Sequence, residues 1–319
     1  MVENEFLPLV SIVIPVYQGA NFVGEAIESA LAQTYPNVEI LVINDGSNDN
    51  GATERAVLAY GDKVRYFSKP NGGVSSALNT GIREMRGEYF SWLSHDDLYA
   101  PEKIEHQVKM LQARAPEDRE LVLMCSGILI NEQGEEIPRF SKNLFCGEYT
   151  GESIFCECQK KFRSMLNGLG MFIPKSILDK VGFFDESLRY IQDYEYWYRI
   201  MIAGFSFLCT KDKDVKSRIH KGQVTARFPD LYYTENEIVG KRMFKLLMCN
   251  EKYTKFLYSY LCGCAKELNP ARKPAIAQLK VNGKYPLYLQ VKIAFYAMMG
   301  RLKQCYKNFY TFIFFRNKR

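Results

Sequence analysis

The sequence predicts an α/β fold: a doubly wound, mostly parallel sheet with helices on both faces, followed by a helical carboxyl-terminal extension. Three observations support this prediction. Strand and helix patterns alternate through the first half of the chain, two short strands end in acidic residues, and the pattern becomes helical from Leu231 onward. Repeated strand–helix units of this kind build parallel sheets with helices on both sides. The 319 residues leave room for one such domain and an extension.

The elements follow in order along the chain. The first is the β-rich run Val10–Val16, in which Pro15 fits a strand end better than a strand centre. A helix with a 3.6-residue apolar stripe follows, and Asn21 is placed to cap it. Pro101 is expected to start a later helix, since proline favours the first turn. The same signals predict strands over 38–43, 64–67, 88–93, 121–130, 168–173 and 205–209, and helices over 22–33, 50–60, 74–85, 102–113 and 193–203.

The change at Leu231 predicts two domains, residues 1–229 and 230–319. Within the first, the βα repeats occupy about residues 8–115, and a more irregular half covers about 116–229. Within the second, helices are expected to the end of the chain. Their expected breaks are Asn269-Pro270, Lys273-Pro274, Asn282-Gly283 and Pro286.

Acidic residues follow two of the predicted strands. Asp45 ends the second strand, and Asp96 and Asp97 end the fourth. Carboxylates at the carboxyl ends of parallel strands point into the crevice where α/β sheets bind ligands. Adjacent acids repel each other, and a divalent cation is the usual reason for a fold to hold them together. Mg²⁺ and Mn²⁺ bind through one or two carboxylates plus substrate phosphates. The pattern therefore predicts an enzyme that binds a nucleotide diphosphate through a metal.

Charge is divided unevenly along the chain. The net charge is +6, but residues 230–319 carry 17 basic and 5 acidic residues, and from Asn269 onward there are 11 basic residues and no acid. Such asymmetry indicates an anionic partner for the extension. The nine cysteines, an odd number without a secretory signal, indicate reduced thiols. The apolar run 293–300 is too short to span a bilayer. We expect a cytoplasmic protein that is soluble or peripheral on the inner face of the cell membrane.

The segment Val10–Ser47 resembles the start of family 2 glycosyltransferases of the bacterial surface-glycan type. It reads VSIVIPVYQGANFVGEAIESALAQTYPNVEILVINDGS. Further motifs in the family's order extend the resemblance over about residues 8–225. It implies the GT-A fold, with a nucleotide-binding half followed by an acceptor and catalytic half. It also implies transfer of a sugar from a nucleotide donor with inversion at the anomeric carbon.

The resemblance implies that Asp45 binds the nucleotide base, because it matches the family's residue that recognises uracil or thymine. An exposed acid after this strand can accept a hydrogen bond from a base N–H. Pro15, Val16 and Tyr17 are expected to form the facing wall, with backbone groups and one ring. The alternative is an aspartate that stabilises the following turn.

Gly72 and Gly73 precede a helix whose first N–H groups are suited to bind phosphate, although a glycine pair is also compatible with a plain turn. Many relatives carry arginine where this chain has Leu78, so a phosphate contact from that arginine is absent or supplied elsewhere.

The remaining matched residues concern metal binding and catalysis. Asp97 matches the direct ligand of Mn²⁺ or Mg²⁺, Asp96 the contact to ribose or donor sugar, and His220 the residue that completes the metal site. Asp193 matches the catalytic base, with Gln192 in place of the usual glutamate. Each has a plainer alternative: a solvated acidic loop, a structural histidine, or an acid that stabilises a helix start. If the base lies elsewhere, Glu195 is the next candidate, whereas Tyr196 and Trp197 are expected to pack the helix. His95 is expected at the surface.

The last residues, 286–319, alternate cationic and aromatic side chains. Basic amphipathic helices with aromatics lie on anionic membranes, but the same pattern suits packing on the enzyme body or in a homo-oligomer. No nucleic-acid-binding motif accompanies the tail, so no nucleic acid partner is expected.

The sequence thus predicts a metal-dependent inverting glycosyltransferase. The expected donor is a UDP-sugar, and the acceptor is a hydroxyl of a glycan, glycoprotein or lipid-linked saccharide. Donor sugar and linkage stay open. The alternatives are a non-catalytic nucleotide- or glycan-binding assembly subunit and a sugar-nucleotide-forming nucleotidyltransferase. The latter requires a basic glycine-rich loop after the first strand, where this chain has Val16–Asn21 without Lys or Arg.

Overall fold

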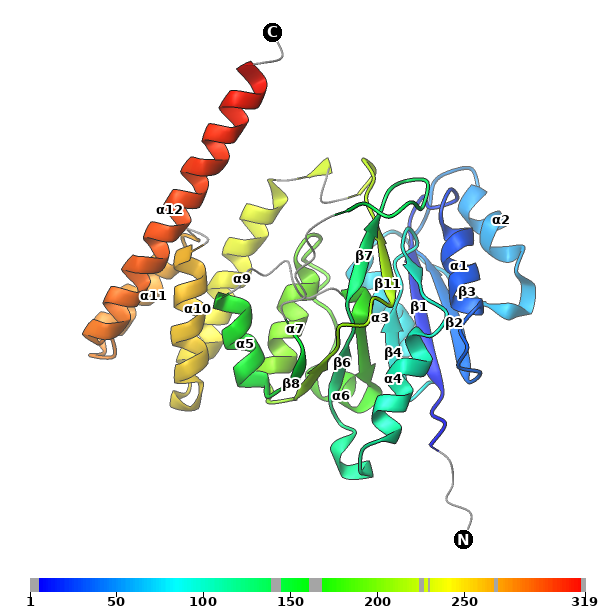
Figure 1. Cartoon of the computed structure of the whole chain (residues 1–319), viewed down its shortest axis with the longest axis horizontal. Coiled ribbons are helices and arrows are strands. Elements are labelled where there is room, and N and C mark those ends of the chain that lie inside the picture. Colours follow the sequence, from blue (N-terminus) through cyan, green and yellow to red (C-terminus); the bar gives the residue numbers. More distant parts are fainter. Residues whose placement is uncertain are drawn as a thin grey trace. The chain divides into compact units, whose positions relative to one another are not determined.

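The computed structural model describes residues 6–138, 145–160, 168–223, 227–228, 230–266 and 269–316, and its account of the side chains ends at Arg301. The chain forms two compact units (Figure 1). The first comprises residues 1–151 and 164–227, and the second comprises residues 152–163 and 228–319. Residues 152–163 therefore group with the carboxyl-terminal helices.

An eight-stranded sheet forms the centre of the first unit, in the order β3-β2-β1-β4-β9-β6-β10-β8. Its described strands pair in parallel from β3 to β4 and between β6 and β10, whereas β9 and β8 pair antiparallel to their neighbours. The sheet is thus more mixed than predicted, because β9 is inserted between β4 and β6. The strands are β1 Val10–Val16, β2 Val38–Asn44, β3 Arg65–Ser68, β4 Tyr89–Trp92, β6 Val122–Met124, β8 Gly147–Tyr149, β9 Met171–Pro174 and β10 Phe207–Cys209.

A second, three-stranded sheet has the order β5-β11-β7, with β5 Leu98–Tyr99, β7 Gly127–Ile130 and β11 Val215–Arg218. The single strand predicted over 121–130 is wrong: the chain leaves the first sheet after Met124 and joins the second at Gly127. A Cβ at Gly127 would stand 2.5 Å from a methyl group of Val215, so the close pairing with β11 requires glycine there.

The described helices of the first unit are α1 Val23–Leu31, α2 Ala52–Leu58, α3 Val74–Glu84, α4 Lys103–Gln112, α6 Lys175–Val181 and α7 Gln192–Ile202, with 3₁₀ turns at Gly61–Lys63, Pro116–Asp118 and Gly168–Gly170. Two predicted helix starts are wrong. Phe22, not Asn21, occupies the cap of α1, without a side-chain hydrogen bond. Pro101 lies two residues before α4, whose cap position is Glu102.

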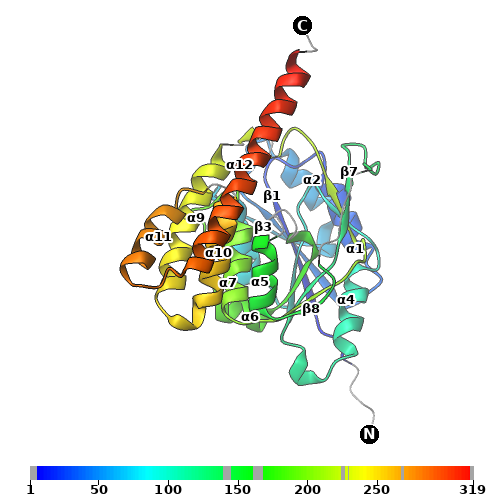
Figure 2. The ribbon, with the colours of Figure 1, turned by 60° about the vertical axis from the view of Figure 1, so that its left-hand side comes forward.

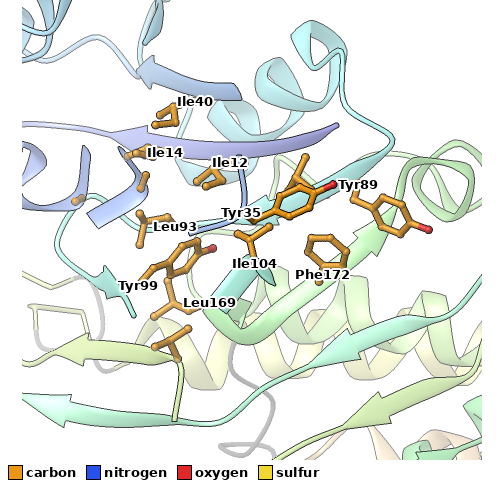
Figure 3. Close-up of a cluster of buried hydrophobic side chains, with 14 of the residues drawn as sticks. Ile12, Ile14, Tyr35, Ile40, Tyr89, Leu93, Tyr99, Ile104, Leu169 and Phe172 are labelled. Atoms are coloured by element: carbon orange, nitrogen blue, oxygen red, sulfur yellow. The ribbon is translucent and has the colours of Figure 1, made fainter. Parts of the chain in front are cut away.

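One cluster of the first unit's core lies on the sheet face to which Ile12 and Ile14 point (Figure 3). Apolar residues of α1 and α4 pack there, including Ile27 and Ile104. Side chains alternate across a strand, so Val13 points to the other face. A Cβ on Gly81 of α3 would collide with Val13, which places α3 against that face. Helices therefore cover both faces, as predicted.

The second unit is helical and contains α5 Gly151–Lys160, α9 Leu231–Met248, a 3₁₀ turn Glu251–Tyr253, α10 Thr254–Lys266, α11 Arg272–Val281 and α12 Leu287–Arg316. In this unit α10 contacts α9, α11 and α12 (Figure 2). The ring of Phe155 on α5 packs against Phe256 and Tyr260 of α10. Throughout the described ranges, no helix has the length and apolarity needed to cross a bilayer.

Two helix breaks differ from the prediction. Lys273-Pro274 does not interrupt a helix, because Pro274 falls in the first turn of α11, where a missing N–H costs little. An unpredicted break occurs at Asn250, whose side chain accepts the Lys252 N–H and starts the next turn.

Candidate active site

Asp45 follows β2 and is enclosed by the loop that precedes α3. It is 3% exposed, and its backbone N–H donates to the Val16 carbonyl at 2.8 Å. Its Oδ1 accepts the Lys69 ammonium at 2.6 Å and the Gly72 N–H at 3.0 Å, and its Oδ2 accepts the Gly73 N–H at 2.7 Å. The acid expected to be exposed is therefore buried. Among the described residues Oδ2 has one donor, which leaves it a lone pair for another.

The predicted facing wall is largely internal. Pro15 and Val16 are buried, and the Val16 carbonyl is used by Asp45. Tyr17 is 42% exposed, so its ring is the part of the wall that a ligand can reach.

The glycine pair lies at the amino terminus of α3. Gly73 is the cap residue with φ of 88°, a conformation that favours glycine. The N–H groups of both glycines already bind Asp45. Leu78 is fully buried and cannot contact a bound phosphate. Two cations lie nearby: Lys69 Nζ is 3.0 Å from the position of a Cβ at Gly72, and Arg189 Nη1 is 3.4 Å from that position at Gly73.

Asp96 and Asp97 occupy the loop between β4 and β5, and they have different surroundings. His220 Nε2 lies 2.8 Å from Asp96 Oδ2, and the Gln223 amide donates to the same oxygen at 3.4 Å. Burial acts to raise the pKa of Asp96, but the charge of His95 and the hydrogen bond of His220 outweigh it and lower that pKa. His95 is only partly exposed, because its ring packs against Gly19.

Asp97 is buried more completely than its neighbour. Its Oδ1 accepts the backbone N–H of Arg218 at 2.7 Å. Burial, followed by the negative charge of Asp96, raises the pKa of Asp97 well above its usual value. The pair therefore holds its second negative charge poorly while no cation is bound.

The two predicted metal ligands are not side by side, because His220 contacts Asp96 whereas Asp97 faces the Arg218 backbone. In the described ranges no group of three or more His, Cys, Asp or Glu side chains is arranged to hold a metal ion. The donor chemistry nevertheless fits Mg²⁺ or Mn²⁺. These ions need only one or two carboxylates when substrate phosphates supply the other ligands, and a buried acid pair is relieved by a cation.

Arg218 organises this loop, and no role for it was predicted. It is 1% exposed. Its guanidinium donates to the Asp96 carbonyl at 2.9 Å, to the Glu132 carbonyl at 2.7 Å and to the Glu25 carboxylate at 2.7 Å, and it lies 4.6 Å from the centre of the Phe22 ring. Its place two residues before His220 is the one sequence signal for it.

Asp193 lies in the first turn of α7, as predicted. Its Oδ1 accepts the Tyr194 N–H at 2.8 Å. Burial raises its pKa to about 7, against the opposing effect of backbone hydrogen bonds. Gln192 is 7% exposed, and its Oε1 has no hydrogen-bond partner in the described part of the chain. Tyr196 and Trp197 are fully buried, which confirms that they pack the helix.

Residues 11–142 match the family model described as glycosyl transferase family 2. An uncharacterized glycosyltransferase of Rickettsia typhi is 44% identical over 225 residues, which cover 70% of this chain and 68% of the relative. The chain belongs to glycosyltransferase family 2. A longer uncharacterized glycosyltransferase of Rickettsia felis is 38% identical over 96% of this chain, which spans about half of that relative (52%).

Solved structures place this glycosyltransferase in the GT-A fold. S. aureus TarS 1-349 in complex with UDP-GlcNAc aligns with a TM-score of 0.65 at 17% identity, over 93% of this chain and 91% of TarS 1-349. The mannosyltransferase PcManGT of Pyrobaculum calidifontis, in complex with GDP-Man and Mn²⁺, aligns with a TM-score of 0.51 at 15% identity, over 95% and 88% of the two chains. At these identities the likeness concerns the fold alone.

Proposed function

We propose that this glycosyltransferase moves a hexosyl or N-acetylhexosaminyl group from a UDP-sugar to a hydroxyl of a glycan, glycoprotein or lipid-linked saccharide, with inversion. The observation that carries the proposal is Asp193, a helix-start acid whose pKa is raised to about 7 by burial. A base with a pKa near the working pH is best suited to accept the acceptor's proton. The UDP-GlcNAc complex of TarS supports a uridine donor.

The base-binding end is formed by Asp45 and Tyr17. Asp45 Oδ2 has an unused lone pair that suits the single ring N–H of uracil. The carboxylate is held in place by Lys69, Gly72 and Gly73, so it needs no rearrangement to accept that bond. The exposed ring of Tyr17 supplies a face for the base.

The diphosphate is bound by cations beside Gly72 and Gly73. Because leucine carries no charge, the phosphate contact that many relatives make from position 78 is absent here or supplied by other residues. Arg189 and Lys69 stand next to the glycine pair. We assign the phosphate contact to Arg189, because its guanidinium stands 3.4 Å from the position of a Cβ at Gly73 and can bind phosphate through two parallel hydrogen bonds.

Asp97 and His220 would hold Mn²⁺ or Mg²⁺ together with the donor diphosphate, and Asp96 would contact the ribose or the donor sugar. When bound, this ion would neutralise the charge that develops on the leaving diphosphate. Asp96 keeps its carboxylate ionised through its histidine neighbours. Arg218 fixes the loop by binding both the Asp96 carbonyl and the Asp97 carboxylate.

Asp193 removes the proton from the acceptor hydroxyl as the oxygen attacks the anomeric carbon. The new carbon–oxygen bond forms on the face opposite the diphosphate, and the old bond breaks with its electron pair going to the phosphate. The proton remains on the Asp193 carboxylate. Glu195 is a poorer base, because it is paired with Arg199 at 2.9 Å.

The decisive experiment is a screen of UDP-, dTDP- and GDP-sugars for transfer and donor hydrolysis with Mn²⁺, repeated with Asp193→Asn. The variant should lose about 10²-fold or more in rate and keep its UDP affinity. Asp179→Asn, which changes an exposed acid on α6, is the matched control and should keep full rate. UDP binding without turnover of any donor by the native enzyme would support the non-catalytic alternative.

We also propose that α12 rests on an anionic membrane surface. Leu287, Val291 and Phe295 are 73%, 62% and 52% exposed and recur at four-residue spacing, which places them on one face. The sequence from Asn269 onward has 11 basic residues and no acid, which complements anionic lipid.

Co-sedimentation with phosphatidylglycerol vesicles tests the membrane proposal. Binding should weaken with salt and be lost in a Val291→Ser/Phe295→Ser variant, but not in Ile238→Ser, the matched exposed position on α9. If the double variant splits an oligomer and leaves vesicle binding unchanged, the apolar face serves subunit packing instead.

A further inference from the structure

A cavity of about 260 Å³ lies within the helical unit and is lined by residues of α5, α10 and α12. All of its lining residues belong to this unit, so the cavity is separate from the acids described above. Nothing in the transfer reaction uses it. It is smaller than the clefts that hold drug-sized ligands, which suits a ligand of a single ring.

Gln159 of α5 is one of the residues that line this cavity, and it carries a buried, unpartnered donor. It is 4% exposed, and its Nε2 has no hydrogen-bond partner among the described residues. A Cβ at Gly263 of α10 would collide with the Gln159 amide, so the amide fits there because residue 263 is a glycine. A buried amide without a partner is costly. Because Nε2 has almost no accessible surface, the Gln159 side chain must turn toward the cavity before a ligand oxygen can satisfy it.

Tyrosine rings supply the apolar lining. Tyr258, Tyr288 and Tyr296 all border the cavity. The rings of Tyr258 and Tyr288 stand edge to face at 6.2 Å, and the Tyr258 hydroxyl donates to the Lys284 carbonyl at 3.2 Å. Such rings offer flat apolar faces that keep a polar edge. They fit the C–H face of a sugar ring while a hydroxyl of that ring meets the Gln159 amide.

The charge of the lining is positive. Lys255 and Lys292 border the cavity, and no acid does. Lys255 is paired with Glu152 at 3.0 Å. In the described part of the chain Lys292 has no acidic partner within ion-pair distance, so it is the cation available to a ligand. An ammonium binds phosphate or carboxylate as a point charge.

We propose that this cavity binds one acidic sugar unit, a hexose that carries a carboxylate or a phosphate. The tyrosine rings stack on the sugar, Gln159 donates to a hydroxyl or ring oxygen, and Lys292 pairs with the acidic group. A lipid chain fits the apolar rings but leaves the buried Gln159 donor unsatisfied. The site is a binding subsite that requires no donor and no turnover.

Calorimetric titration of the full chain with glucuronic acid, glucose 1-phosphate and glucose tests the proposal. Saturating UDP and Mn²⁺ are present, so that the first unit's site is occupied. Both acidic sugars should bind more tightly than glucose. Lys292→Gln should weaken the acidic sugars by about tenfold, the value of a charge-assisted hydrogen bond, and leave glucose unchanged. Gln159→Leu should weaken all three.

Lys245→Gln, which removes an exposed lysine of α9 outside the cavity, is the matched control and should change nothing. The exposed Tyr288→Ala provides a second test that spares the buried core, and it should also weaken all three sugars. Equal affinity for glucose and its acidic derivatives, or no effect of Lys292→Gln, would overturn the proposal. Displacement of a bound sugar analogue by phosphatidylglycerol vesicles alone would assign the cavity to lipid and overturn it as well.

Discussion

The loops after β2 and β4 both bury aspartates, but only the first compensates its charge within the protein. Asp45 receives an ammonium and two backbone N–H groups. Asp97 receives the Arg218 N–H but faces Asp96, and its pKa is raised by burial first and by that neighbour second. The pKa of Asp193 is also raised by burial. The charge at the proposed base-binding end is thus compensated by the protein, whereas the proposed reacting end holds acids whose charge the described residues balance poorly.

This contrast has a physical reason. A residue that only recognises a base benefits from rigid preorganisation, since each prior hydrogen bond fixes its geometry. A residue that takes up a proton must have a protonation equilibrium near the working pH, and full compensation would abolish it. The compensated Asp45 and the poorly compensated Asp97 and Asp193 therefore differ as a binding site and a reaction site are expected to differ.

Arg218→Lys should have the largest effect, because it destabilises the loop that carries Asp96 and Asp97. Lysine keeps the positive charge but lacks the guanidinium nitrogens that donate to the Asp96 and Glu132 carbonyls and to Glu25. Removing such a partner from a buried network costs about 3–5 kcal/mol of unfolding free energy, measured by urea denaturation. Glu25→Gln is the control and should cost at most about 1 kcal/mol, because Glu25 is 52% exposed at its side chain. Similar costs for both would mean that the carbonyl contacts contribute little.

The pH dependence of the rate should report Asp193. With a pKa of about 7, the base form is lost as pH falls, so kcat/KM should drop about 50-fold between pH 7 and pH 5. The folded pKa exceeds the unfolded one of about 3.9. Asp193 therefore favours folding least above pH 7, and Asp193→Asn should gain stability relative to the native enzyme as pH rises from 4 to 8. A rate without an acidic limb near pH 7 would exclude this acid as the base.

The acids at strand ends and the helix-start acid were predictable because local signals fix them. A β-rich run ending in Asp45, and an apolar helix opening at Asp193, need only neighbours in sequence to be located. Both were found where the patterns predicted. Their surroundings were not predictable, because Asp45 is enclosed by glycines 27 and 28 residues away.

Long-range pairing explains the other differences. Arg218 binds the Asp96 carbonyl 122 residues away and Glu25 193 residues away, and no local pattern marks such contacts. The division of 121–130 into two strands depends on β11, which pairs with β7 from far along the chain. The raised pKa of Asp97 likewise results from its burial in the folded protein, which the spacing of residues in the sequence does not reveal.

Mn²⁺ should stabilise the reacting end and leave the base-binding end unchanged. With UDP saturating, Mn²⁺ at ten times its Kd should add about 1.4 kcal/mol to the free energy of unfolding, and chelator should remove the gain together with transfer. Asp97→Asn should abolish the gain. Tyr17→Ala, at the exposed base-binding surface, should keep it. Full transfer activity in chelator would refute the metal role assigned to the acid pair.

The smallest expected effect concerns the packing that holds Asp45. Gly46 has φ of 69°, and a Cβ there would stand 2.6 Å from the backbone nitrogen of Asn71. The side-chain amide of Asn71 donates to the Asp45 carbonyl at 2.9 Å. Gly61 has φ of 55° and open space around it, so it provides a matched control. Both alanine variants incur the left-handed backbone cost of about 1–2 kcal/mol.

Only Gly46→Ala adds a collision with backbone, for which we expect about 1 kcal/mol beyond the control. Because the displaced loop carries the donors of Asp45, UDP affinity should fall in Gly46→Ala and stay unchanged in Gly61→Ala, as measured by calorimetry. Equal stability loss with unchanged UDP affinity in both variants would show that the loop adapts without moving Asp45. The base-binding end would then be less preorganised than the comparison with the acid pair implies.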